Sequence, residues 1–176
     1  MGRWGRIDVL VNNAGVFAAM PLGEATANRI GQLLDVNVTA PSLLASVALP
    51  YLKESRGAIV NVSSTFGHRP AAGAGHYGAS KAALEQLTRS WALELAPDGI
   101  RVNAVAAGPT ESEALSSAGL PDAAVDQIKA DEAARIPLGR RGGPDELAAW
   151  IVRLAGPGTA WLTGQVLTVD GGLELT

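Results

Sequence analysis

Residues 58–96 read AIVNVSSTFGHRPAAGAGHYGASKAALEQLTRSWALELA, and this stretch decides the fold because it combines a buried strand, a loop and a long helix. The strand ends at Ser63 and Ser64, and the helix begins near Tyr77 and Lys81. Tyr77 and Lys81 lie one helical turn apart, so their side chains share a face. A free tyrosine has a pKa of about 10, which a fixed ammonium beside it lowers by stabilising the phenolate. With a serine hydroxyl that holds a substrate oxygen, these groups suffice for proton transfer to or from an alcohol or ketone.

The composition bounds the class of protein. The chain has 176 residues, which suits one domain, and its 47% hydrophobic and 18% charged residues argue for a sizeable core and against disorder. The net charge of -3 argues against a nucleic-acid surface, which would be basic. The absence of cysteine excludes disulfides and thiolate metal sites and fits a cytoplasmic setting; we expect no metal cofactor.

Targeting signals are not expected. The apolar run at 7–11, which follows the N-terminal arginines, is too short for the core of a signal peptide. Gly2 follows Met1, as in a myristoylation signal, but position 6 is an arginine, whereas the signal needs a hydroxyl residue there. No apolar run approaches the length that spans a bilayer, so we expect no membrane association.

Apolar runs alternate with helical patterns along the chain. We expect strands at 7–11, 58–62, 100–107 and 165–169, and helices that start at Thr26 and near 38, 77 and 144. The run at 7–11 reads as a strand buried on both faces. This alternation indicates an open α/β parallel sheet.

Several helical features have an expected role. Thr26 is expected to cap a short helix. Residues 38–54 are expected to form a longer helix, in which Pro41 fits the first turn and Pro50 loosens the end. Leu84, Leu87, Trp91 and Leu95 form one stripe of the helix 77–96, which indicates core or a partner helix. Residues 112–136 are expected to form one or two short helices in a binding loop or lid.

Ligands of such sheets bind outside the carboxyl ends of the strands. The segment Asn12-Asn13-Ala14-Gly15, Ser64 and Gly108 all fall at such ends. Taken alone, NNAG is as consistent with an ordinary turn as with a ligand site. Asn37 alone is more consistent with a local backbone partner than with a catalytic residue. Residues 73–78 match GxGxxG, but the preceding strand ends ten residues earlier, so the match is coincidental.

Other chemistries are disfavoured. A serine hydrolase would need a GxSxG elbow, which is missing, and His68 and His76 read as loop residues. HExxH and Walker A patterns are missing as well. Arg140 and Arg141 are open to an anion-site interpretation, but a solvated turn is favoured.

Six blocks follow one another in an order that resembles the short-chain dehydrogenase/reductase family. They are RIDVLVNNAG (6–15), DVNV (35–38), IVNVSS (59–64), YGASK (77–81), RVNAVAAGPT (101–110) and LTGQVLTVDGG (162–172). The resemblance implies a Rossmann-like, doubly wound parallel sheet. It also implies oxidation of an alcohol or reduction of a carbonyl in a small molecule, with NAD or NADP as cofactor. The substrate and the choice of cofactor stay open.

The resemblance also assigns the catalytic residues. Tyr77 would be the general acid/base, and Lys81 would lower its pKa and bind the nicotinamide ribose. Ser64, thirteen residues before the tyrosine, would hold the substrate oxygen, whereas Ser63 would be structural. Asn37 would order a water that relays protons to Lys81.

The implied cofactor-binding residues are Asn12, Ala14, Gly15, Tyr77, Lys81, Gly108, Thr110 and Ser112, of which Thr110 and Ser112 would contact the nicotinamide amide. Ala107 stands where the family usually has proline, so we expect a less rigid strand exit. The family commonly forms dimers and tetramers through its two long helices and last strand. A homodimer or homotetramer is therefore expected, with the 84–95 stripe and 165–169 as interfaces.

The main departure from the family lies before NNAG. Family members begin with a strand, a glycine-rich turn and a helix that hold the pyrophosphate, but only eleven residues precede NNAG here. The chain thus resembles the C-terminal two-thirds of a member, a single domain over 1–176 that lacks the first three strands. The strand order 3-2-1-4-5-6-7 would become 4-5-6-7, with 7–11 as an exposed edge. We expect these residues to bind NAD(P) weakly or not at all, whereas the full-length parent would be a working oxidoreductase; the alternative is a weak or inactive fragment that serves as a scaffold.

Overall fold

A four-stranded parallel sheet forms the centre of the computed structural model, which describes residues 5–112 and 121–176. Its strands are β1 (Val9–Asn12), β2 (Ala58–Ser64), β3 (Arg101–Ala107) and β4 (Val166–Val169). They lie in the order β1-β2-β3-β4, and every neighbouring pair is parallel. The predicted class, strand order and orientation are confirmed.

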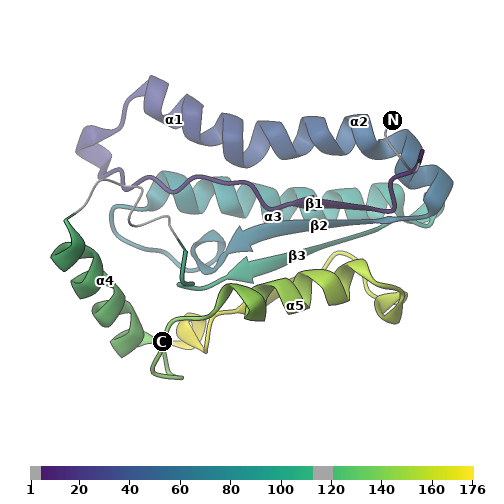
Figure 1. Cartoon of the computed structure of the whole chain (residues 1–176). Coiled ribbons are helices and arrows are strands. Elements are labelled where there is room, and N and C mark those ends of the chain that lie inside the picture. Colours follow the sequence, from purple (N-terminus) through teal and green to yellow (C-terminus); the bar gives the residue numbers. More distant parts are fainter. Residues whose placement is uncertain (1–4, 113–120) are drawn as a thin grey trace.

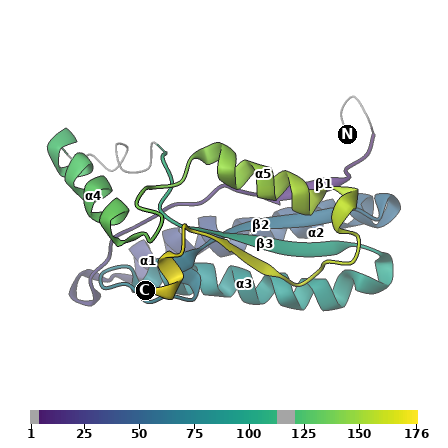
Figure 2. The ribbon, with the colours of Figure 1, turned by 90° about the horizontal axis from the view of Figure 1, so that it is seen from below.

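Helices cover both faces of this sheet. The described helices are α1 (Ala27–Leu34), α2 (Ala40–Ser55), α3 (Gly75–Leu95), α4 (Asp122–Arg135) and α5 (Pro144–Ala155). Helices α2 and α3 lie on one face and α5 on the other (Figures 1 and 2), whereas α4 stands beyond one end of the sheet. This is the doubly wound arrangement that the resemblance implied.

Two cores result from the alternation of side chains along the strands. The first joins Ile59 and Val102 of the sheet to Leu52 of α2 and to Ala92 of α3. The second joins Val60 and Val105 to Leu154 of α5. Because successive residues point to opposite faces, Asn61 lies on the α3 side, next to the first core.

The helix after Thr26 is longer than predicted. Thr26 Oγ1 accepts a hydrogen bond from the Arg29 amide at 3.3 Å, so the predicted cap is confirmed. The chain then stays helical over the 29 residues Ala27–Ser55, because a π-helical turn, Asp35–Thr39, joins α1 to α2. The expectation of two separate helices was therefore wrong, since the widened turn absorbs the join instead of breaking it.

The same helix is long and apolar enough to cross a membrane, with a mean hydropathy of 1.4. Its inner face, however, packs against the sheet through Ala45, Ala48 and Leu52. A core helix of a layered α/β domain has the same length and composition, so this is weak support for a membrane span.

Strand β1 lies at the edge of the sheet. Val9 and Val11 are 37% and 40% exposed, whereas Leu10, on the other face, packs against the first core. The expectation that this strand is buried on both faces was therefore wrong, and the expectation of an exposed apolar edge is confirmed. The cause is its position: α2 covers one face of β1, whereas Val9 and Val11 on the opposite face are left open.

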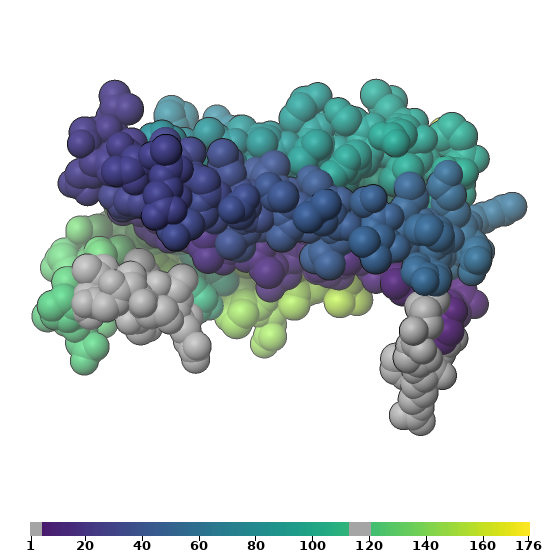
Figure 3. All heavy atoms as spheres, turned by 90° about the horizontal axis from the view of Figure 1, so that it is seen from above, coloured from purple at the N-terminus to yellow at the C-terminus, as the bar shows by residue number. Residues whose placement is uncertain are grey.

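The outer surface of the helical layer exposes several large apolar side chains. In Figure 3 the atoms of α1 and α2 form a continuous row beside those of α3. Leu43, Val47 and Leu93 on this layer are 62%, 72% and 81% exposed. Leu84 and Leu95 are buried in the fold at 1% and 7% exposure, so the core interpretation of this stripe is confirmed for them and the interface interpretation is not.

Gly57 is predicted from this packing to be a position where any side chain destabilises the fold. A Cβ there would lie 2.3 Å from the Asp8 carbonyl oxygen and 2.9 Å from the Leu52 side chain, because the chain passes tightly from α2 into β2. Gly57→Ala should lower the free energy of unfolding by about 1–3 kcal/mol, as overpacking does. Urea unfolding measures this.

Gly31→Ala is the matched control. Gly31 lies within α1 and has nothing within 4 Å of an added Cβ. Its substitution should raise the free energy of unfolding by about 0.5–1 kcal/mol, because alanine loses less entropy in a helix. Equal effects at both positions would contradict the packing described for Gly57.

Candidate active site

The side chains singled out in the sequence converge at the carboxyl ends of β1, β2 and β3. Ser64 is the last residue of β2, and Tyr77 and Lys81 occupy the first two turns of α3. Gly108 directly follows β3. A Cβ on Gly108 would lie 2.5 Å from the Asp170 side chain, so only glycine allows β3 and the segment after β4 to approach this closely.

Tyr77 lies among aromatic rings. Its ring makes edge contacts with Phe17 at 5.0 Å and with Phe66 at 6.4 Å between centroids. Burial raises the pKa of Tyr77, and a hydrogen bond with Ser64 acts in the opposite direction. The expected lowering by Lys81 is not seen, because the Lys81 ammonium lies 5.9 Å from the ring centroid and makes its hydrogen bond elsewhere. Tyr77 therefore holds its proton at neutral pH.

Lys81 is a buried cation. The residue is 5% exposed, and its Nζ donates a hydrogen bond to the Val62 carbonyl at 2.9 Å. Burial lowers the pKa of Lys81 to about 8, because the charged form loses its hydration. The ammonium still carries its charge at pH 7, and its bond to Val62 uses one of three donor positions.

Asn37 sits on the π-helical turn and is 1% exposed. Its Oδ1 accepts from the Val16 amide at 2.9 Å, and its Nδ2 donates to the Val16 carbonyl and to Ser80 Oγ, both at 3.0 Å. Ser80 in turn donates to the Tyr77 carbonyl at 2.7 Å. Asn37 thus fastens the segment after NNAG to α3, which is the backbone-partner role that the sequence left open.

The two adjacent serines face different neighbours. Ser64 interacts with Tyr77 and accepts a hydrogen bond from the Phe66 amide at 3.3 Å. Ser63 donates to the buried carboxylate of Glu85 at 2.9 Å. Ser64 is therefore the serine that faces the tyrosine, and Ser63 fastens β2 to α3.

A pocket of about 690 Å³ opens beside Ser64 and Tyr77. Its walls are mainly apolar or aromatic: Phe17, Ala18, Phe66, Pro109, Ile128 of α4 and Leu173. Arg29 and Glu132 also line it. No pattern in the sequence indicates Phe17, Phe66 or Leu173, because they lie in a loop and in short turns without periodicity and reach the pocket only through the tertiary fold.

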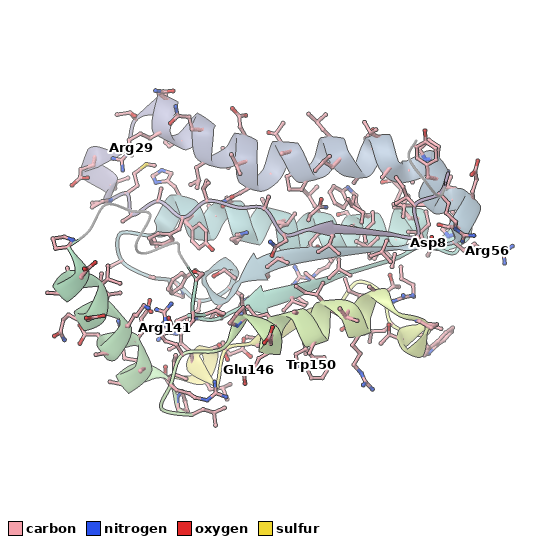
Figure 4. The ribbon with its side chains drawn as sticks, viewed as in Figure 1. Asp8, Arg29, Arg56, Arg141, Glu146 and Trp150 are labelled. Carbon is pink, nitrogen blue, oxygen red and sulfur yellow. The ribbon has the colours of Figure 1, made fainter. Side chains whose placement is uncertain are left out.

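Arg141 was also missed, since a solvated turn was expected at 140–141. Its side chain is only 7% exposed, and it forms ion pairs with Glu111 and with Glu132 of α4. It also donates to the Thr110 carbonyl at 2.5 Å. Figure 4 shows Arg141 between α4 and the end of the sheet, so it ties the pocket wall to the segment after β3. Arg140 does lie in solvent, paired with Glu146.

His68 links two carboxylates, one on α3 and one near the C-terminus. Its Nδ1 lies 3.1 Å from Glu85 and its Nε2 lies 2.9 Å from Glu174. Glu174 belongs to the C-terminal turn Leu173–Leu175, whose first residue lines the pocket. His68 is a loop residue, as predicted, and it fastens that turn to α3.

The residues at the strand ends fit the nicotinamide half of a dinucleotide. Asn12 is 5% exposed, and its Oδ1 has no hydrogen-bond partner among residues 5–112 and 121–176. A Cβ on Gly15 would lie 3.1 Å from Lys81 Nζ, so glycine leaves the ammonium accessible. An unpaired acceptor and a cation with unused donor positions suit the hydroxyl and amide groups of such a cofactor.

The remaining expected cofactor residues border the same region. Ala14 is exposed beside Gly15, and Thr110 Oγ1 donates to the Gly108 carbonyl at 2.9 Å. Ser112 is exposed at the end of the first described range, and residues 113–120 of the expected lid lie outside the described residues. Within the described ranges, no cluster of three or more His, Asp or Glu side chains is arranged to hold a metal ion.

Comparison with known proteins identifies the family. Residues 1–174 match the family model described as enoyl-(acyl carrier protein) reductase. A 3-oxoacyl-[acyl-carrier-protein] reductase of Thermotoga maritima is 42% identical over 98% of this chain and 68% of its own length. A cis-4-hydroxycyclohexanecarboxylate dehydrogenase of Sinomonas cyclohexanicum is 39% identical over 96% of this chain and 66% of its own.

Solved structures agree. A gluconate 5-dehydrogenase from Burkholderia cenocepacia, in complex with NADP and tartrate, superimposes with a TM-score of 0.90 at 30% identity, over 99% of this chain and 67% of that one. A short-chain dehydrogenase/reductase from Caenorhabditis elegans, solved with cofactor, superimposes with a TM-score of 0.89 at 36% identity, over 98% of this chain and 67% of that one. The chain belongs to the short-chain dehydrogenase/reductase family of oxidoreductases and spans about two thirds of the length of these relatives.

Proposed function

We propose that this protein is an NAD(P)-dependent oxidoreductase that interconverts an alcohol and a carbonyl compound, with Tyr77 as general acid/base. The observation that carries the proposal is that Ser64 and Tyr77 line one pocket and interact with each other there. A hydroxyl pair in a mainly apolar pocket is a site for one substrate oxygen.

Proton transfer follows from the state of Tyr77. Because burial raises its pKa, Tyr77 is a neutral phenol that can donate its proton to a carbonyl oxygen held by Ser64. The hydrogen bond between Ser64 and Tyr77 acts against the effect of burial and so favours the phenolate that remains. Asn37 keeps the first turn of α3 in place through Ser80. In the oxidising direction the phenolate takes the proton back.

Asn12, Ala14, Gly15, Lys81, Gly108, Thr110 and Ser112 are the residues that would hold the cofactor. When bound, NAD(P) supplies or accepts the hydride at the substrate carbon. The protein's own contribution is to orient the substrate oxygen and to exclude water from the pocket through its aromatic wall of Phe17 and Phe66.

The lining also bears on the substrate. The walls accept an apolar or cyclic body, and α4 closes one side through Ile128. We include residues 112–136 as a substrate-binding lid on this basis. The carboxylate Glu132 in the lining is paired with Arg141, so it does not repel an electron-rich carbonyl oxygen.

Self-association is part of the proposal. The exposed apolar side chains on α2 and α3 include Leu43, Val47 and Leu93, which suits a homodimer or homotetramer. The same surface also favours the alternative, a scaffold that associates without catalysis. Turnover separates the two.

Tyr77→Phe tests the proton transfer. The substitution removes the hydroxyl and keeps the ring contacts with Phe17 and Phe66, so kcat on a panel of ketones and alcohols with NADH and NADPH should fall about 10²–10⁴-fold. Tyr51→Phe, at the only other tyrosine, should leave kcat unchanged. Turnover that survives Tyr77→Phe would overturn the assignment, and a stable dimer without turnover would favour the scaffold.

Lys81→Met tests the buried charge. The folded pKa of about 8 lies below the ordinary 10.5, so below pH 8 the folded state bears the cost of burying the ammonium. The free energy of unfolding of the variant should therefore be about 1–3 kcal/mol higher than that of the wild type at pH 7, while its activity is lost. Between pH 8 and 10.5 the unfolded wild type binds the proton and the folded wild type does not. The stability of the wild type therefore rises with pH in this range, and the stability difference between Lys81→Met and the wild type vanishes.

Lys53→Met is the matched control for this titration. Lys53 is 47% exposed and pairs with Asp98 at the surface, so its removal relieves no buried charge and should not raise the free energy of unfolding from pH 7 to 10.5. Chemical unfolding followed across this range measures both variants. A constant difference between Lys81→Met and wild type would contradict the depressed pKa.

A further inference from the structure

A second cavity, the side cavity, adjoins the main pocket that contains Ser64 and Tyr77. Its volume is about 340 Å³. The walls that it shares with the main pocket are Phe66, Pro109, Glu132 and Leu173. Among the walls that belong to the side cavity alone are Arg69, in the loop between β2 and α3, and Arg135, in the last turn of α4. The two cavities therefore lie side by side, and two arginines line the second.

Neither of these arginines pairs with a carboxylate among residues 5–112 and 121–176. Arg69 Nη2 donates to the Thr176 carbonyl at 3.2 Å and lies 3.4 Å from Thr176 Oγ1. Arg135 Nε donates to the Asp131 carbonyl at 3.0 Å. Figures 1 and 2 show the last turn of α4 close to the C-terminal turn, where Arg69 is bonded. Because a guanidinium carries five N–H donors, most donors of both arginines stay available for a ligand.

The carboxylates around the side cavity already have partners. Glu132, which lines it, is in the ion pair with Arg141. Glu174 of the C-terminal turn contacts His68, and the Asp131 carboxylate accepts a hydrogen bond from a glutamine of α4 at 2.8 Å. The positive charge of the side cavity is therefore not neutralised by these groups, although the net charge of the chain is -3. A cleft lined by one sign of charge attracts ligands of the opposite sign.

Arg29, which lines the main pocket, differs from these two arginines. It donates to the Ala19 and Glu24 carbonyls at 3.0 and 3.1 Å, and its Nη1 lies 3.8 Å from the Glu24 carboxylate. Arg29 thus holds the loop before α1 and has a counter-charge of its own. The cations without a carboxylate partner lie in the side cavity.

We propose that Arg69 and Arg135 bind an anionic group of the substrate, a carboxylate or a phosphate, while the carbonyl of the same molecule lies in the main pocket. The planar fork of a guanidinium matches the oxygens of both kinds of anion. The substrate is then an oxo acid or an oxo phosphate ester, or the matching alcohol, whose apolar body lies along the shared walls. The proposal rests on the proposed function, because it takes alcohol–carbonyl interconversion as the reaction.

Matched pairs of ketones test this substrate class. Levulinate, 5-oxohexanoate and 6-oxoheptanoate, each compared with its uncharged methyl ester, probe a carboxylate at increasing distance from the carbonyl. Hydroxyacetone phosphate compared with hydroxyacetone probes a phosphate. The kcat/KM of the wild type with NADH or NADPH should favour the charged member of at least one pair by about 10–100-fold, as for charge-assisted hydrogen bonds. The pair that shows the preference identifies the anion.

Arg69→Gln and Arg135→Gln should each reduce this preference about tenfold, mainly through KM, because glutamine lacks the charge and the fork. Arg153→Gln is the matched control: Arg153 is exposed on α5 and lines neither cavity, so the preference should persist. Arg135 is also exposed, so its substitution tests the site even if Arg69→Gln does not fold. A preference that is absent from the wild type, or that survives both substitutions, would overturn the proposal.

Binding without turnover separates this proposal from the proposed function. Ligand-observed NMR titration of the full chain with the same pairs, without nucleotide, should show tighter binding of the charged member, and Arg135→Gln should remove the difference. Turnover of the uncharged ketones with equal binding of both members would overturn the anion site and leave the proposed function intact. No turnover of any ketone, with the charged members still bound through Arg135, would overturn the proposed function and leave the anion site.

Discussion

The hydrogen bond from the buried Lys81 ammonium to the Val62 carbonyl is the interaction on which the site depends. It fixes the start of α3 against the end of β2, two residues before Ser64, and so brings Tyr77 to that serine. A strand end and a helix start that are joined by a loop become one surface by this contact. The wide turn at Asn37 and the Ser63–Glu85 bond hold the same junction from two other sides.

Holding a cation in this place is unfavourable for folding, and the lowered pKa of Lys81 shows it. The surrounding polar groups are arranged to serve the site more than the stability of the fold. Burial keeps the Tyr77 proton in place, whereas the hydrogen bond with Ser64 favours its departure during the reaction. Opposed influences of this kind suit a group that must both give and take a proton.

Patterns in the sequence were sufficient for the sheet and for the central side chains. Apolar runs gave the parallel strands, and the spacing of Tyr77 and Lys81 with Ser64 at a strand end gave the proton-transfer group. The continuous helix through Asp35–Thr39 was missed because a π-helical turn has no distinct pattern of residue types. Phe17, Leu173 and the buried Arg141 were missed because their roles arise from contacts between distant segments. The direction of the Tyr77 pKa shift depends on burial, which the spacing of two residues does not reveal.

The central claim is that these residues form one site for alcohol–carbonyl interconversion with NAD(P). Its most direct measurement is the reduction of a ketone panel with nicotinamide cofactor deuterated at its reactive carbon, with the product analysed by mass spectrometry. We expect an alcohol that carries deuterium at the former carbonyl carbon when the wild-type chain is present, formed about 10²–10⁴-fold more slowly with Tyr77→Phe. Unlabelled product, or no alcohol from any ketone with either NADH or NADPH, would contradict it.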